Sequence, residues 1–220
     1  MPLKPTLQAR LVTVSSAAGV IGPTIFAIFS IVLGYLWPGY NPLTQTVSEL
    51  GATNAPTMEL QALNFTILGI LTLIFAIGLD IHDRRFLSTS VLVGIYGLGA
   101  LLVAGLPCDP GCSFKGSSLV QIAHNLDALI SFIVLAVAPL FFSRSSKTIP
   151  SWTKASVWSL RVALASILLL GAYLLITVLS LSPYLGLLQR IFLGLLFAWV
   201  IMIAYKMARM PLINQGRPSP

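Results

Sequence analysis

Residues 11–36 read LVTVSSAAGVIGPTIFAIFSIVLGYL, and residues 37–60 continue WPGYNPLTQTVSELGATNAPTMEL. The first stretch has no charged residue, and it is longer than the roughly 20 residues that a helix needs to cross a bilayer. The second stretch is polar, rich in proline and glycine, and free of lysine and arginine. Together the two stretches predict a membrane-spanning helix followed by a loop on the far side of the membrane.

The rest of the chain repeats this alternation. Of its 220 residues, 56% are hydrophobic and only 9% are charged, whereas a soluble domain carries about 25% charged residues. The apolar runs are continuous and not alternating, which favours helices over a membrane barrel. The first run is also too long for the apolar region of a signal peptide. We therefore expect an all-α integral membrane bundle of six helices, at about 11–36, 60–79, 87–106, 122–142, 157–180 and 186–206. These helices would form one domain over residues 1–210, followed by a disordered tail over 211–220.

The basic residues indicate the orientation of the bundle. Ten of them lie in the termini and in the loops on one side, whereas the opposite loops contain only Lys115. Basic loops stay in the cytoplasm, so both termini are predicted to be cytoplasmic, in a multi-pass protein of the cell membrane. This topology accounts for the net charge of +7 without a nucleic-acid partner. The ten residues are Lys4, Arg10, Arg84, Arg85, Arg144, Lys147, Lys154, Lys206, Arg209 and Arg217.

A cluster of polar residues is expected near the outer side. His124 and Asp127 are three residues apart at the start of the fourth helix, and this spacing places them on one face. Arg190, beside Gln189, lies about one turn inside the sixth helix. A charge at such depth is costly unless it faces the bundle and is paired. We therefore expect Arg190 to approach Asp127 or Glu49, with His124 nearby.

The first outer loop has two interpretations. Residues 43–50 lie between the turn at Asn41 and Pro42 and the breaks at Gly51 and Pro56, and they have room for one or two helical turns. In the first interpretation they re-enter the membrane face and bring Ser48 and Glu49 to the cluster. In the second the loop is solvated, and Ser48 and Glu49 cap a turn.

The chain's two cysteines, Cys108 and Cys112, flank Asp109 in the second outer loop. An oxidising exterior permits a disulfide between them, and this is the pairing we expect. Two free thiols, or a redox or metal role, are the alternatives. On the opposite side, residues 79–86 (LDIHDRRF) gather acidic, basic and histidine residues, and we interpret them as a solvated cytoplasmic turn.

Several of these motifs resemble those of a known family. The stretch PGYNPLTQTVSELGATNAP, then PCDPG, a histidine that opens the fourth helix, and GLLQRIFLGLLFAW resemble the six-pass family catalogued as domain of unknown function 998. More distantly, the loop is similar to that of the Frag/DRAM/Sfk-type six-pass proteins. The resemblance implies a six-helix membrane protein and no particular activity. Its motif positions fall on Ser48, Glu49, Asp109, His124, Gln189 and Arg190, whereas Asp127 comes only from helix spacing.

Three function classes remain open on the sequence. A three-histidine zinc site is excluded within one chain, because the two histidines, His82 and His124, are predicted on opposite sides, and no HExxH motif is present. A hydrolase would use Ser48 as nucleophile, His124 as base and Asp127 or Asp109 as orienting residue, although no GxSxG motif surrounds Ser48.

We favour binding of a lipid headgroup or small ligand in an outward-facing pocket formed by Ser48, Glu49, Asp109, His124, Asp127, Gln189 and Arg190. Transport, or a purely structural cluster, is the other alternative. No cofactor and no metal are expected, membrane lipids are the expected partners, and the oligomeric state is left open.

Overall fold

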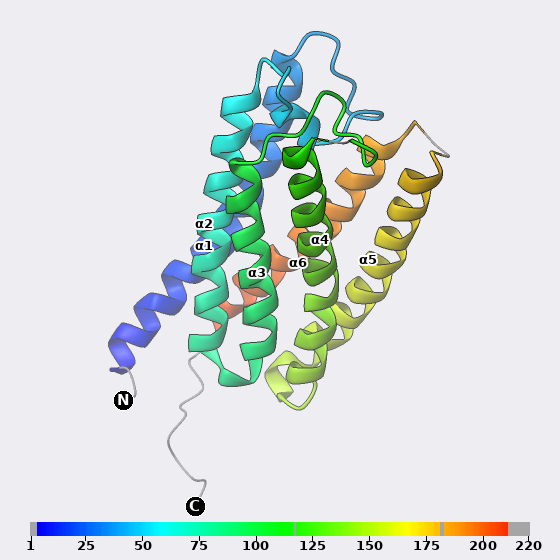
Figure 1. Cartoon of the computed structure of the whole chain (residues 1–220). Helices are drawn as coiled ribbons and strands as arrows, with labels where there is room; N and C mark the ends of the chain where they lie inside the picture. Colours follow the sequence, from blue (N-terminus) through cyan, green and yellow to red (C-terminus); the bar gives the residue numbers. More distant parts are fainter. Residues whose placement is uncertain (1–3, 117, 181–182, 211–220) are drawn as a thin grey trace, which may run out of the picture.

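The computed structural model describes residues 4–116, 118–180 and 183–210, and within these ranges it contains helices and loops but no strand. Six long helices follow one another along the chain (Figure 1). All six are long and apolar enough to cross a membrane, which confirms the predicted all-α architecture with six spans. They are α1 (Pro5–Leu36), α2 (Met58–His82), α3 (Leu87–Ala104), α4 (Leu119–Ser146), α5 (Thr153–Leu179) and α6 (Leu185–Arg209). Three short 3-10 turns, η1 (Ser48–Gly51), η2 (Arg84–Phe86) and η3 (Pro150–Trp152), lie in the connections.

The helices form a closed ring of neighbours. Each packs against the next in sequence, and α6 also packs against α1. The two termini lie at one end of the bundle, called here the terminal end (Figure 1). The two long connections, 37–57 and 105–118, lie together at the opposite end, called here the loop end (Figure 1). An even number of spans places both termini on one side, as the sequence predicts, whereas their cytoplasmic location remains a prediction.

Small residues bring the first three helices close together. A Cβ atom added to Gly69 of α2 would lie 2.8 Å from the carbonyl oxygen of Gly97 in α3. Ser90 of α3 donates a hydrogen bond of 2.6 Å to the carbonyl of Ala76 in α2. Close backbone approach and short polar bonds of this kind hold helices together in a bilayer, where water cannot drive apolar association.

The outward faces of the bundle are apolar. Large exposed side chains occur on every helix, among them Ile31, Ile77, Leu102, Leu168 and Ile191. Such a surface would be a liability in water, whereas hydrocarbon chains cover it without cost. The fold therefore supports a multi-pass membrane protein.

Aromatic side chains fill the bundle toward the terminal end. Four aromatic residues are fully buried there, Phe86, Phe142, Trp152 and Trp199. The ring of Phe142 contacts the other three, with centroids 4.8 Å from Phe86, 5.4 Å from Trp152 and 6.0 Å from Trp199. His82 is buried among them and stacks against Phe86. The interpretation of residues 79–86 as a fully solvated turn is therefore wrong at His82 and Asp83, since both are buried and the ring of His82 lies against Phe86 and Trp152.

Most helices extend beyond the predicted apolar runs. α1 begins at Pro5 and not at residue 11, and α4 continues to Ser146, four residues past the predicted end. The added turns contain polar residues such as Gln8, Arg10 and Arg144, because a helix can continue into the interfacial region after its apolar run has ended. The tail predicted over 211–220 lies outside the described residues.

Candidate functional site

The first connection, residues 37–57, is tightly folded. Asn41 starts a turn by accepting the backbone N–H of Leu43 on its side chain at 3.0 Å and that of Gln45 on its carbonyl at 2.8 Å. Glu49 accepts the backbone N–H of Thr46 at 2.8 Å, together with the Thr46 hydroxyl at 3.3 Å. This is the carboxylate half of a capping box, in which a Thr is followed three residues later by a Glu. The Glu49 carboxylate is thus used inside its own loop, as the solvated-turn interpretation expects, although the residue itself is buried.

This loop is docked on the beginning of α6. Gln189 accepts the backbone N–H of Val47 at 2.7 Å, and the N–H of Leu187 donates to the carbonyl of Leu43 at 3.0 Å. Gly186 permits this contact, since an added Cβ would lie 2.7 Å from the Pro42 carbonyl oxygen. The first loop therefore closes the loop end of the bundle and forms part of its interior.

Arg190 fixes the same loop from one turn deeper in α6. Its guanidinium donates to the carbonyls of Pro42 at 2.7 Å, Gln45 at 2.8 Å and Gly186 at 3.0 Å, and also to the Tyr40 hydroxyl. Burial raises the pKa of Tyr40, and the neighbouring Arg190 charge opposes part of that increase. The phenol therefore stays neutral and can accept from Arg190.

The predicted pairing of Arg190 with an acidic residue is not formed. Among the described residues, ion pairs link only Asp80 with Arg84 and Asp83 with Arg85. Arg190 instead satisfies its donors on backbone carbonyls, and Glu49 satisfies its oxygens on Thr46 and Gln45. Both charges are held by neutral partners, which supply several hydrogen bonds without requiring the two side chains to meet.

The second connection, residues 105–118, is held by the first turns of α4. Ser118 caps that helix by accepting the N–H of Gln121 at 3.0 Å. Gln121 in turn accepts the backbone N–H of Asp109 at 2.7 Å and donates to Asn125 at 2.8 Å. His124 makes a 2.7 Å hydrogen bond through Nδ1 to the carbonyl of Leu106. No sequence motif singled out Gln121 and Asn125, although they lie four residues apart on the helix face that also presents His124.

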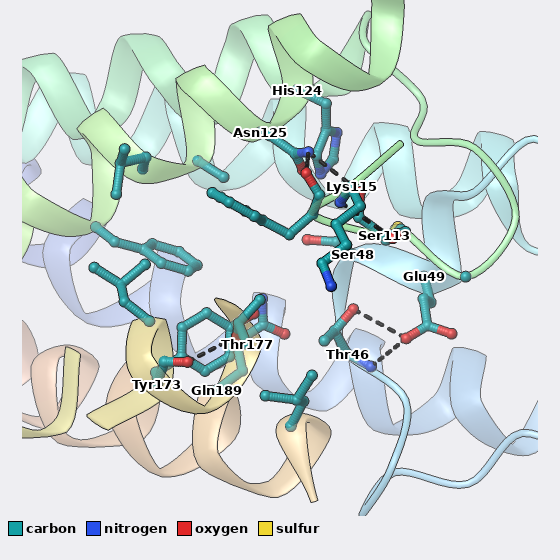
Figure 2. A pocket seen from close by; sticks show the side chains of 18 of the residues that line it. Thr46, Ser48, Glu49, Ser113, Lys115, His124, Asn125, Tyr173, Thr177 and Gln189 are labelled. Atoms are coloured by element: carbon teal, nitrogen blue, oxygen red, sulfur yellow. Dashed lines mark hydrogen bonds between the residues drawn. The ribbon is translucent and has the colours of Figure 1, made fainter. Parts of the chain in front are cut away.

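A cavity of about 280 Å³ with a mixed polar and apolar wall lies between the two loops and the loop-end halves of α4, α5 and α6. Figure 2 shows Thr46 and Ser48 from the first loop, His124 and Asn125 from α4, Tyr173 and Thr177 from α5, and Gln189 from α6. Lys115 and Ser113 reach its edge from the second loop (Figure 2). Apolar side chains complete the wall, chiefly Phe114, Leu129, Phe132, Leu174 and Leu185.

A second, smaller cavity of about 40 Å³ lies in the bundle interior. The two cavities share Ser48, Ala128, Phe132 and Gln189 as wall residues. Asp127 lines the smaller cavity and not the larger one, and no hydrogen-bond partner for it exists among the described residues. The three-residue spacing predicted that His124 and Asp127 would share one cluster. In the structure His124 lines the larger cavity and Asp127 lines the smaller one beside it.

The structure gathers most of the predicted site residues and leaves two outside. Ser48, Glu49, His124 and Gln189 all line the larger cavity. Arg190 lies behind the loop wall, and Asp109 lines neither cavity, although its backbone closes the turn to Cys112. No Ser–His–Asp chain is present in the described part of the protein, because the ring of His124 is oriented by a backbone carbonyl and no carboxylate contacts it.

The predicted disulfide is present between Cys108 and Cys112. Cys108 is fully buried and its carbonyl accepts the N–H of Thr53 at 2.9 Å, which joins the two connections of the loop end. Cys112 lies on the wall of the larger cavity. The two sulfur atoms and a ring nitrogen of His124 lie within 4.8 Å of one another, the one group of potential metal ligands in the residues that the structure describes.

Comparison with curated proteins and with solved structures finds no match. A protein-family profile described as "Protein of unknown function (DUF998)" matches residues 20–206. The matched range begins inside α1 and ends near the end of α6, so it takes in both connections of the loop end and the two cavities. Since this range covers most of the chain, the protein belongs to the DUF998 family.

Proposed function

We propose that the larger cavity binds a small amphiphilic molecule, with the polar headgroup of a membrane lipid as the most suitable ligand. The observation that carries this proposal is the division of the cavity wall. One part of the wall consists of polar side chains with unused hydrogen-bonding groups. The other part is apolar and lies on helices whose outer faces suit lipid.

Three donors on the polar wall have no protein partner among the described residues. They are the hydroxyl of Ser48, the ammonium group of Lys115 and the amide nitrogen of Gln189. Gln189 is almost fully buried, and its carbonyl oxygen is already bound to Val47. A buried donor that lacks a partner costs free energy, so a ligand that supplies an acceptor gains affinity there. Phosphate, carboxylate and ester oxygens are acceptors of this kind, and all occur in lipid headgroups.

The apolar wall suits the part of a lipid next to its headgroup. Leu129 and Phe132 of α4, Leu174 of α5 and Leu185 of α6 all line the cavity. A binding site with a few placed polar groups and a largely apolar wall is typical of small-molecule pockets. A charged metabolite without an apolar part would leave this side of the cavity unused.

A transporter or a hydrolase receives less support from the same residues. The fully buried aromatic cluster of Phe86, Phe142, Trp152 and Trp199 fills the bundle toward the terminal end, which favours a blind pocket over a continuous path. Ser48 and His124 line one cavity, but no hydrogen bond joins them, and the Glu49 carboxylate is bound within its own loop. Binding requires no further rearrangement of these groups.

Cavity filling tests the proposal. Leu129→Trp places an indole in the larger cavity, whereas the control Leu126→Trp makes the same change on an exposed position of the same helix. Each protein is extracted with its surrounding lipids and analysed by native mass spectrometry, and its melting is then measured with and without the lipids found. Because a ligand of the folded state raises its stability, added lipid should raise the melting temperature of the wild type and of Leu126→Trp.

Leu129→Trp should lose both the co-purified lipid and the lipid-dependent shift in melting. Retention of the same lipid at the same stoichiometry by Leu129→Trp would place it on the outer surface and contradict the proposal. Ser48→Ala separates binding from hydrolysis. A binding site should lose only the contribution of one of its three free donors, about 10-fold in affinity at most, whereas an enzyme that uses Ser48 as nucleophile would lose turnover completely.

A further inference from the structure

Two cysteines and a histidine come together on one wall of the larger cavity. The sulfurs of Cys108 and Cys112 and a ring nitrogen of His124 lie within 4.8 Å of one another. We propose that, once the disulfide is reduced, these three side chains form a Zn²⁺ site that opens toward the cavity. This inference is independent of the lipid-binding proposal, because it concerns a different ligand and uses neither the apolar wall nor the unpaired donors.

The histidine is held as a metal ligand would be. A backbone carbonyl can only accept, so the 2.7 Å bond to Leu106 requires the proton of the neutral ring to be on Nδ1. The lone pair is then on Nε2, which has no partner among the described residues. Histidines that bind metals commonly donate their second ring N–H to a carbonyl or a carboxylate in this way, and the bond fixes the ring orientation.

The cysteine-bearing turn is held by bonds other than the disulfide. The Cys108 carbonyl accepts from Thr53, the N–H of Cys112 donates to the Asp109 carbonyl at 2.9 Å, and the N–H of Asp109 donates to Gln121. Gly111 and Cys112 adopt left-handed backbone conformations, with φ of 80° and 43°, which turn the chain back so that both sulfurs lie on the same side. These contacts should keep the two thiols close together after the S–S bond is broken.

The chemistry requires a reductant of the dithiol class. One dithiol molecule is oxidised to its own disulfide, and the Cys108–Cys112 disulfide accepts the two electrons and two protons to become two thiols. When Zn²⁺ binds, the two thiols lose these protons and coordinate as thiolates, while His124 coordinates through Nε2. Two cysteines and one histidine are an established ligand set for zinc with one position left open, and Cys112 and His124 both face the cavity where that position would lie.

Zinc binding to the purified protein tests the inference. The full chain in detergent is reduced with a dithiol, freed of the reductant under inert gas, and titrated with Zn²⁺ alone. Bound metal is measured by elemental analysis, and melting is followed in parallel. We expect one zinc per reduced chain, a zinc-dependent rise in melting temperature, and neither effect in the oxidised protein.

His124→Ala should weaken zinc binding by about 10-fold or more, whereas Ser113→Ala beside the site should leave it unchanged. Titration with Co²⁺ gives an independent measure, since thiolate ligands produce a sulfur-to-cobalt charge-transfer band. That band should be absent in the Cys108→Ser/Cys112→Ser double variant, and it can be recorded on the wild type even if the double variant does not fold. Failure of the reduced wild type to bind zinc, or equal zinc affinity in His124→Ala, would overturn the inference and leave the disulfide a purely structural bond.

Discussion

At the scale of single residues, the polar side chains of the loop end bind backbone more than they bind one another. Arg190 donates to three carbonyls, His124 to that of Leu106, and Gln189 accepts from the N–H of Val47. The sequence predicted that these side chains would be buried and need partners, which the cost of desolvation requires. It predicted the wrong partners for Arg190, because every residue has a carbonyl and a sequence pattern therefore cannot indicate which one a side chain will reach.

Replacement of Arg190 measures what this residue contributes. Arg190→Ala removes four hydrogen bonds. It leaves the carbonyl of Pro42 without this donor and the carbonyl of Gln45 with only the Tyr40 hydroxyl at 3.3 Å, so the loop over α6 should loosen. A buried acceptor that loses its partner costs about 1–3 kcal/mol, and we expect a loss of stability within that range, seen as a lower melting temperature. Arg190→Lys should recover only part of the loss, because an ammonium group lacks the planar fork of donors. Arg144→Ala is the matched control, since Arg144 is exposed at the end of α4. Equal melting of Arg190→Ala and Arg144→Ala would show that the loop is held by other contacts.

At the scale of elements, the length of the apolar runs determines where the helices lie, and polar contacts determine how the connections between them fold. Each of the six predicted runs corresponds to one helix of the structure, although 87–106 and 157–180 extend past the ends of α3 and α5. A bilayer leaves an apolar stretch of this length few alternatives to a helix. The connections were less predictable. Asn41 and Gly51 mark breaks in the first loop, whereas the fold of that loop depends on a Thr46–Glu49 capping contact and on docking against α6. The capping pattern is visible in TVSE, residues 46–49, and was a usable signal. The docking depends on contacts between residues more than 140 positions apart, which no local pattern contains.

The turn between α2 and α3 gives a pH-dependent prediction at this scale. Asp83 accepts the backbone N–H of Arg85 at 2.9 Å and pairs with its guanidinium at 2.7 Å. Burial alone would raise the pKa of Asp83, but the hydrogen bonds and charge of Arg85 together hold it below the usual value. A depressed pKa in the folded state means that this stabilisation is present above the unfolded pKa of about 3.9 and is lost as pH falls through the folded value.

Two variants separate the charge of Asp83 from its hydrogen bond. Asp83→Asn keeps an acceptor for the Arg85 N–H and should cost less than about 1 kcal/mol at neutral pH, because Arg85 is half exposed and solvent screens the pair. Asp83→Ala also loses the cap and should cost about 1 kcal/mol more. Thermal melting at pH 7 and at about pH 3 measures both differences. The gap between wild type and Asp83→Asn should shrink at the lower pH, and a gap that stays constant would contradict the assignment of the charge effect to Asp83.

At the scale of the whole molecule, the two ends of the bundle differ in how they are filled. Aromatic rings pack the interior toward the terminal end, whereas two folded loops enclose a polar cavity at the loop end. The composition predicted a membrane bundle, and the positions of Ser48, His124 and Gln189 indicated an outer polar site. The existence and size of the cavity were beyond prediction, because they depend on how far α5 is separated from α4 and on the course of both loops. Because the cavity lies at one end only, the orientation of the bundle in the membrane decides which compartment has access to it.

We predict that the terminal end faces the cytoplasm and the cavity faces the exterior. Nine basic residues of the described chain lie in the loops or at the helix ends of the terminal end, and basic segments of this kind are retained in the cytoplasm. Reporter fusions provide the measurement. A reporter that is active only in the cytoplasm should work when fused after Pro220 and fail when inserted at Gly39, a turn glycine with no neighbour within 4 Å of an added Cβ. A reporter that requires export should give the opposite pattern.

As a control, the first reporter inserted at Lys147, between α4 and α5, should match the C-terminal fusion, because both positions lie at the terminal end. Activity of the exported reporter at Lys147 and at the C-terminus would invert the bundle. The cavity would then face the reducing cytoplasm, where the Cys108–Cys112 disulfide would not be expected to persist.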